Sequence, residues 1–132
     1  MRNFLAWLMV MTASPVALAA DLREGVYKLT GTNPGNLEAV YIGTVTIQRT
    51  GDDFQLTWAI GPKQTQSGVA YLDHDVLSVS YLDASGQDEG VVSYRVLDGK
   101  LEGHWCPRRS DRCGTETLEF LRAVDSVPAN GA

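Results

Sequence analysis

Methionine is nearly absent from this chain, and its distribution divides the sequence into two segments. All three methionines lie within the first eleven of the 132 residues, whereas all 13 glycines lie beyond position 20. The first segment carries Arg2, an apolar run at 4–11 and the motif Ala-Leu-Ala at 17–19, which together form the pattern of a secretory signal peptide. We therefore expect residues 1–20 to be cleaved and the protein to be secreted or periplasmic.

Long apolar runs and lipid-attachment signals are lacking beyond the expected cleavage site. No later run approaches the roughly 20 apolar residues that span a bilayer, and no cysteine directly follows the site, so we expect no membrane anchor. Residues 21–124 suffice for a single domain, because domains usually need about 100 to 150 residues. The small, polar tail at 125–132 is expected to be disordered.

Positive charge is also scarce. Removal of Arg2 lowers the number of Lys and Arg residues from 11 to 10 while the 16 acidic residues remain, which leaves a net charge of −6. An acidic chain is repelled by nucleic acid and by anionic membrane surfaces. The sequence therefore excludes both as expected partners.

Catalytic and metal-binding motifs are missing. The sequence contains no G-x-S-x-G, H-E-x-x-H or P-loop motif. The segment 73–75 (Asp-His-Asp) lacks a fourth metal ligand and is predicted to be a polar turn. Asp83 and Asp88 lie in a loop, with nothing to separate their pKa values as acid–base catalysis requires. We expect no enzyme activity, no metal and no cofactor.

Helical periodicity is absent, whereas alternation of apolar and polar residues recurs between glycine-containing breaks. This pattern predicts an all-β fold, an eight-stranded antiparallel up-and-down (meander) barrel, with a β-sandwich as the alternative. A barrel of this size is either filled by side chains or holds one small ligand. The predicted strands are 25–31, 38–49, 53–60, 64–71, 76–82, 90–97, 100–106 and 114–122.

The pair Asp98 and Gly99 predicts a two-residue hairpin loop of type I′. The resulting register places Tyr94 opposite Gly103, so that an aromatic ring covers a glycine on the inner face. On the outer face the same register places Arg95 opposite Glu102, a favourable pairing of opposite charges.

The two cysteines, Cys106 and Cys113, are predicted to form a disulfide. Pairing them sets the register of the last strand and places Leu118 on the inner face, as the alternation of that strand independently requires. Directly opposed positions also have a Cα separation that a disulfide bridges. An oxidising compartment makes two free thiols the weaker alternative.

Glu116 is the most informative single residue, because its alternation points it into the barrel, where a carboxylate needs hydrogen bonds. One interpretation makes it the polar anchor of an aromatic ligand pocket. In the other, it accepts hydrogen bonds from Tyr or Trp, or pairs with Arg49, and only stabilises the barrel end, while the aromatic side chains fill the core. The candidate ligand-binding residues are Tyr41, Trp58, Tyr81, Tyr94, Trp105 and Glu116.

The segment between the cysteines carries Arg108, Arg109 and Arg112 and one aspartate, a net charge of +2 on an acidic chain. A disulfide-tied arginine loop suits contact with an acidic protein surface, because arginine is enriched at binding hot spots. The alternative is a solvated hairpin tip without a partner.

The order of turn glycines and inward aromatics carries a resemblance. It rests on Tyr27, Leu29, Gly31, 33–35, Tyr41, Gly43, Val45, Ile47, 51–52, Phe54, Leu56, Trp58, 60–61, 77–79, Tyr81, Tyr94, 98–99, Leu101, Gly103, Trp105 and 114–116. In these positions the chain resembles small secreted bacterial proteins that are often labelled fibronectin-binding protein and whose layout is similar to that of avidin- and lipocalin-like barrels. The resemblance implies a barrel and a binding function, and the insertion at 106–113 departs from it.

These observations predict a secreted, non-enzymatic binding module that holds a small amphipathic or apolar ligand in the barrel mouth or presents a binding surface. The alternative is a protein-binding adhesin, or an inhibitor of a secreted enzyme, that contacts an extracellular or periplasmic protein through the arginine loop.

Overall fold

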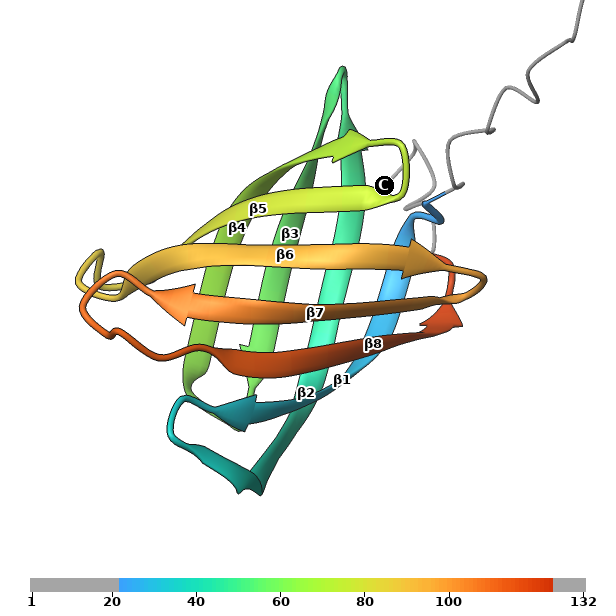
Figure 1. The fold of residues 1–132 in the computed structure, drawn as a ribbon. Helices are drawn as coiled ribbons and strands as arrows, with labels where there is room; N and C mark the ends of the chain where they lie inside the picture. Colours follow the sequence, from blue (N-terminus) through green and yellow to red (C-terminus); the bar gives the residue numbers. More distant parts are fainter. Residues whose placement is uncertain (1–21, 125–132) are drawn as a thin grey trace, which may run out of the picture.

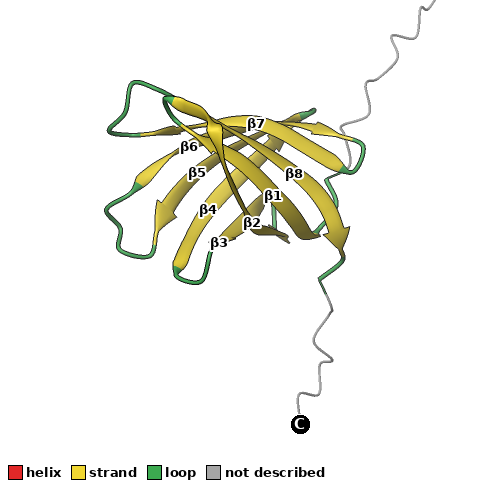
Figure 2. Cartoon of the chain, turned by 90° about the horizontal axis from the view of Figure 1, so that it is seen from below, coloured by secondary structure: helices red, strands yellow, loops and turns green. Residues whose placement is uncertain are grey.

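The computed structural model of the chain describes residues 22–124, which form a closed, wholly antiparallel β-barrel (Figures 1 and 2). The predicted signal peptide and the predicted tail lie outside the described residues. The strands are β1 (Gly25–Asn33), β2 (Asn36–Thr50), β3 (Asp53–Ile60), β4 (Gln64–Asp73), β5 (Val76–Asp83), β6 (Glu89–Leu97), β7 (Lys100–Pro107) and β8 (Gly114–Arg122).

Each strand pairs with its neighbour in sequence, and β1 pairs with β8 to close the barrel. All eight strands begin and end within two residues of the predicted positions. The meander barrel is therefore confirmed and the sandwich is wrong. Closure removes the free edges that a sheet of this kind would otherwise expose. Among the described residues, no helix is long and apolar enough to span a membrane.

The predicted hairpin registers are also confirmed. Tyr94 lies opposite Gly103, and Trp105 lies opposite Gly114. Cys106 and Cys113 form the disulfide, with a Cα–Cα distance of 4.4 Å. Because the bridge spans only seven positions, it ties the tip of the β7–β8 hairpin.

One detail of the predicted hairpin, the turn type, is wrong, whereas the predicted opposition of Arg95 and Glu102 is confirmed. A type I′ loop requires positive φ at both central residues, but Gly99 alone has it, at 68°, and Asp98 avoids a conformation that strains a side chain. Arg95 does lie opposite Glu102, yet its guanidinium is nearest to Asp75, at 3.9 Å, while Glu102 binds Lys100 at 2.9 Å. Long side chains on the outer face reach diagonal and same-strand partners as readily as the one directly opposite.

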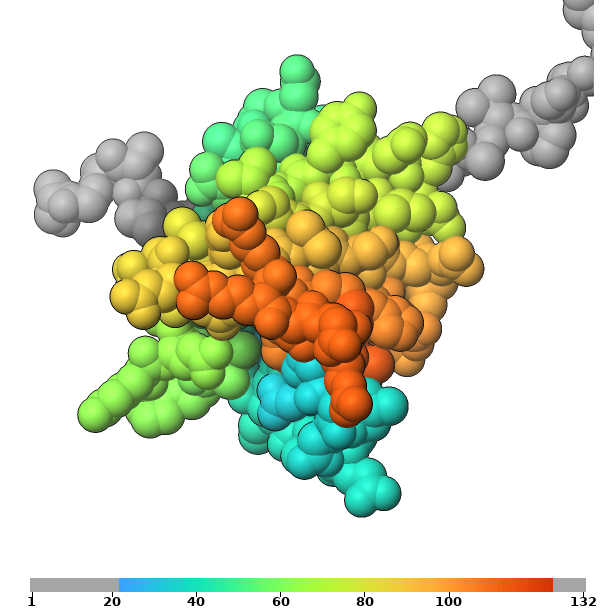
Figure 3. Space-filling model, turned by 60° about the vertical axis from the view of Figure 1, so that its left-hand side comes forward, coloured from blue at the N-terminus to red at the C-terminus, as the bar shows by residue number. Residues whose placement is uncertain are grey.

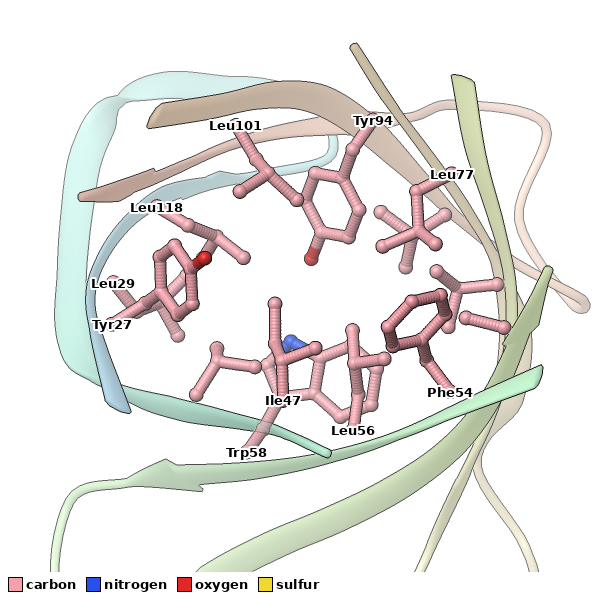
Figure 4. Close-up of a cluster of buried hydrophobic side chains, with 14 of the residues drawn as sticks. Tyr27, Leu29, Ile47, Phe54, Leu56, Trp58, Leu77, Tyr94, Leu101 and Leu118 are labelled. Atoms are coloured by element: carbon pink, nitrogen blue, oxygen red, sulfur yellow. The ribbon is translucent and has the colours of Figure 1, made fainter. Parts of the chain in front are cut away.

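The barrel interior is divided into two halves. In the half around the 51–52, 74–75 and 98–99 turns, aliphatic and aromatic side chains form a solid core, part of which is shown in Figure 4. The segment before β1 closes this end, because Leu22 packs against the core and Arg23 lies 3.9 Å from the centroid of the Phe120 ring. The filled core contains Tyr27, Leu29, Val45, Ile47, Phe54, Leu56, Leu77, Val79, Val96, Leu101 and Leu118.

Removal of the disulfide tests its structural contribution. Replacing Cys106 and Cys113 with serine frees a short loop in the unfolded chain, and we expect the free energy of unfolding to fall by roughly 2 to 3 kcal/mol. Urea denaturation followed by circular dichroism measures this change, with the wild-type protein in a reducing agent as the control. An unchanged denaturation midpoint in both samples would contradict the expected contribution.

Candidate functional site: an aromatic cavity at the barrel mouth

The other half of the barrel holds a cavity of about 170 Å³. It opens at the end that carries the loops 34–35, 61–63, 84–88 and 108–113, which we call the mouth. Figure 3 shows the left-hand side of Figure 1, where the 108–113 loop (orange) lies across this end of the barrel. The cavity is lined by Asn33, Tyr41, Trp58, Ile60, Gln64, Gln66, Tyr81, Asp88, Val92, Trp105 and Glu116.

Four aromatic rings form one connected wall of the cavity. Successive rings meet edge to face, with centroids 6.2 Å apart for Trp58 and Tyr81, 6.5 Å for Tyr81 and Trp105, and 6.3 Å for Tyr41 and Trp105. This geometry is favourable for aromatic pairs because the positive ring edge meets the negative ring face. The indole Nε1 of Trp105 donates to the carbonyl of Thr32 at 3.0 Å, which fixes the ring.

Inward-facing glycines on adjacent strands let these rings lie against the barrel wall. A Cβ atom on Gly68 would lie 2.9 Å from Cζ3 of Trp58, and one on Gly114 would lie 2.5 Å from Nε1 of Trp105. Cβ atoms do not approach other atoms this closely, and at both positions a backbone carbonyl oxygen lies nearer still, so a larger residue would displace the ring and the neighbouring strand. Gly31 and Gly90 lie against Tyr41 and Tyr81 in the same way. The glycines therefore create the space that the cavity occupies.

Glu116 lies at the inner end of the cavity and is only 5% exposed. Tyr41 donates its hydroxyl to Oε1 at 2.9 Å, and Tyr94 donates its hydroxyl to Oε2. Figure 4 shows the Tyr94 hydroxyl and the Trp58 indole pointing toward each other across the barrel axis. Each carboxylate oxygen has one tyrosine donor and keeps acceptor capacity for a further group.

Burial raises the pKa of Glu116, because removing the carboxylate from water disfavours its charged form. Hydrogen bonds from Tyr94, Tyr41 and Trp58 act in the opposite direction and only partly offset the effect of burial. The pKa of Tyr81 rises to about 12, through burial and then the nearby carboxylates of Asp88 and Glu116. The Tyr81 hydroxyl is therefore protonated at neutral pH.

Tyr81 is the one side chain in residues 22–124 with a buried polar atom that lacks a hydrogen-bond partner. Its hydroxyl belongs to a side chain that is 4% exposed and lines the cavity. A buried hydroxyl without a partner is costly. The hydroxyl lies against the barrel wall, since a Cβ atom on Gly90 would lie 2.5 Å from it.

The structure brings together most of the predicted ligand-binding residues. Tyr41, Trp58, Tyr81, Trp105 and Glu116 line the cavity, and Tyr94 lies behind Glu116, where it holds the carboxylate without lining the space. The suggested pairing of Glu116 with Arg49 is wrong. Arg49 lies at the filled end, where its Nε donates to the carbonyl of Gly51 at 3.1 Å.

Several lining residues escaped the sequence interpretation. Gln66 lies opposite Trp58 in the β3–β4 register, so its inward alternation could have identified it. Asn33, Gln64 and Asp88 lie at strand ends or in a loop, where alternation gives no signal for side-chain direction. No group of three or more His, Cys, Asp or Glu side chains within the described chain is placed to hold a metal ion.

The arginine loop lies at the same end of the barrel, but its arginines do not line the cavity. Arg108 forms an ion pair with Glu89, so part of its charge is neutralised within the chain. Arg112 lies against the β1–β2 turn, since a Cβ atom on Gly35 would lie 3.0 Å from its Nη1. Arg109 is exposed to solvent.

Comparisons with solved structures support the fold. A de novo designed fluorescence-activating β-barrel is similar to this chain with a TM-score of 0.62 at 14% identity, over 78% of this chain and 97% of the design. The fatty acid transporter REP1-NXSQ is similar with a TM-score of 0.50 at 12% identity, over 76% of this chain and 97% of the transporter.

No protein-family model and no curated protein matches the sequence. The resemblance to avidin-like or fibronectin-binding proteins therefore has no support beyond a shared barrel. The comparisons place the chain in a structural class, the small eight-stranded antiparallel β-barrels, and leave its function to be argued from the cavity.

The raised pKa of Glu116 predicts how stability depends on pH. A raised carboxyl pKa in the folded state means that the folded protein binds the proton of Glu116 more tightly than the unfolded chain does. The resulting contribution to the free energy of unfolding is fully present below the unfolded pKa of 4.5 and is lost as pH rises through the folded pKa. The free energy of unfolding of wild type minus that of Glu116→Gln should fall across this window, by up to about 1.4 kcal/mol per pH unit.

Urea denaturation of both proteins at several pH values measures this difference. Glu119→Gln, which removes the same charge from an exposed position on β8, controls for the change in net charge. A difference between wild type and Glu116→Gln that stays flat or rises with pH would show that burial does not dominate the titration of this carboxyl group.

Proposed function

We propose that this protein is a non-enzymatic binding protein that holds one small amphipathic ligand in the aromatic cavity at the barrel mouth. The observation that carries the proposal is a cavity of about 170 Å³ lined by aromatic rings and by the buried carboxylate of Glu116. An apolar, aromatic pocket with a few convergent polar groups is typical of small-molecule sites. The two similar barrels are described as a fluorescence-activating design and a fatty acid transporter, which agrees with ligand binding by this fold.

The size of the cavity limits the ligand. A dry cavity of about 150 Å³ in another protein accommodates benzene, and the present cavity of about 170 Å³ is similar. We expect the enclosed part of the ligand to have about six to ten non-hydrogen atoms. A long acyl chain exceeds this space because the other half of the barrel is filled by the core.

A secreted or periplasmic location is supported by the Cys106–Cys113 disulfide, because such bonds persist in oxidising compartments. The absence of enzyme activity remains part of the proposal. It is supported by the lack of a nucleophile–base pair among the lining residues, of which the acidic members are Asp88 and Glu116.

A second function, contact with an acidic protein surface, is favoured by the arginine loop. Its disulfide holds Arg109 and Arg112 exposed, and neither forms an ion pair with the described part of the chain. Arg108 contributes less to such a surface, because Glu89 already binds it. This function and ligand binding use different residues at the same end of the barrel.

Obstruction of the cavity tests the principal proposal. Isothermal titration with benzyl alcohol, 2-phenylethanol, indole and 2-phenylethylammonium should reveal saturable binding of at least one compound at one site per chain. Gln66→Trp places a large ring at the mouth and should weaken that binding by about tenfold or more, since it removes the space that the ligand needs.

The matched control is Ser67→Trp, which adds the same ring at the next position of β4, on the exposed outer face. It should bind the compound as wild type does. The proposal fails if wild type binds none of the four compounds, or if Gln66→Trp and Ser67→Trp bind equally well while both retain the β-sheet circular dichroism spectrum.

A further inference from the structure

We infer that the ligand of the barrel-mouth cavity is a small organic cation, an ammonium group on a compact apolar body, recognised by the aromatic wall and the carboxylate of Glu116. This inference rests on the proposed binding function and adds the chemical class of the ligand. It follows from the charges that line the cavity, the arrangement of the rings and the unused hydrogen-bonding capacity of the polar groups.

The charges of the lining residues are all of one sign. Glu116 lies at the inner end of the cavity and Asp88 lies at the mouth, and no Lys, Arg or His within residues 22–124 lines the space. A cavity with low-dielectric walls concentrates the field of such charges. Transfer of a cation into this site is therefore favoured, whereas transfer of an anion is opposed by two carboxylates.

The aromatic wall is suited to the same ligand. Trp58, Tyr81, Trp105 and Tyr41 follow one another around the cavity with interplanar angles of 62°, 73° and 77°. Several aromatic side chains around one space are the arrangement by which aromatic cages bind ammonium groups. Tryptophan provides the strongest attraction of this kind, and both tryptophans of the described chain line the cavity.

Glu116 keeps acceptor capacity that an ammonium group can use. The Tyr41 and Tyr94 hydroxyl groups donate to Glu116, so their hydrogens are already used. Each oxygen of Glu116 accepts from one of these hydroxyls and keeps a free lone pair. An ammonium group carries only donors, which complements a carboxylate that only accepts.

The arginine loop does not reverse this preference. Its three arginines lie at the same end of the barrel, yet they are outside the cavity lining, and the ion pair with Glu89 neutralises Arg108. Arg109 and Arg112 are exposed, so water and salt screen their charges. A ligand with a carboxylate would have to place that group at the rim, away from Glu116.

A set of ligands that differ only in charge tests the inference. Isothermal titration at near-neutral pH compares 2-phenylethylammonium, 2-phenylethanol and phenylacetate, which share one aromatic ring and similar size. We expect the ammonium to bind at least about tenfold more tightly than the alcohol, because cation–π attraction and the carboxylate act on it alone. Phenylacetate should bind most weakly.

Glu116→Gln should bring the dissociation constants of the ammonium and the alcohol close to each other, since it removes the buried negative charge. Glu119→Gln removes an equal charge from the outer face of β8 and should preserve the wild-type preference. Circular dichroism verifies that both variants fold. If Glu116→Gln does not fold, the order of the three ligands on the wild-type protein still decides the inference.

The outcomes separate the two proposals. If the alcohol binds as tightly as the ammonium, or if phenylacetate binds most tightly, the inferred charge of the ligand is wrong while the binding function stands. A preference for the ammonium that persists in Glu116→Gln would also overturn the assigned role of this carboxylate. Absence of binding by all three ligands, together with a negative result for the neutral compounds tested above, would overturn the binding function itself.

Discussion

A buried carboxylate determines the organisation of this barrel. Glu116 is 5% exposed, and a charge in that position is tolerated only when hydrogen-bond donors surround it. Tyr41 on β2 and Tyr94 on β6 come from strands two places from β8, one on either side of it, and both hydroxyls converge on Glu116 of β8. The hydrogen bonds across the barrel therefore join three strands that do not pair with one another, and they separate the filled core from the cavity.

The cavity exists because small residues face inward beside large ones. Where the interior is filled, aliphatic side chains from all the strands meet at the axis; toward the mouth, the aromatic rings lie against glycines of the neighbouring strands instead. This alternation keeps the rings near the wall, and the space they leave is lined by aromatic and polar side chains, with Glu116 at its inner end. The same sequence feature thus provides the curvature of the barrel and the chemistry of its interior.

Sequence reasoning recovered the fold well because the strands alternate clearly and the two hairpins that share β7 are each consistent in register. Tyr94 over Gly103 followed from the hairpin turn, and the pairing of Cys106 with Cys113 set the second register. The inward direction of Glu116 followed from alternation and tyrosine donors were one alternative, but Tyr41 could not be singled out, because it lies 75 positions away and the contact depends on barrel closure. The sequence is compatible with either a filled or a hollow interior, and the barrel contains one half of each kind.

Direct observation of the cavity in solution would test the central claim, that the aromatic half of the barrel is a ligand site built around Glu116. The indole N–H groups of Trp58 and Trp105 can be followed by ¹H–¹⁵N NMR during titration with 2-phenylethylammonium. The account predicts that both resonances shift together and saturate at one ligand per chain, because both indoles line the cavity. Unchanged indole resonances, with shifts confined to backbone amides of the outer face or of the arginine loop, would contradict it.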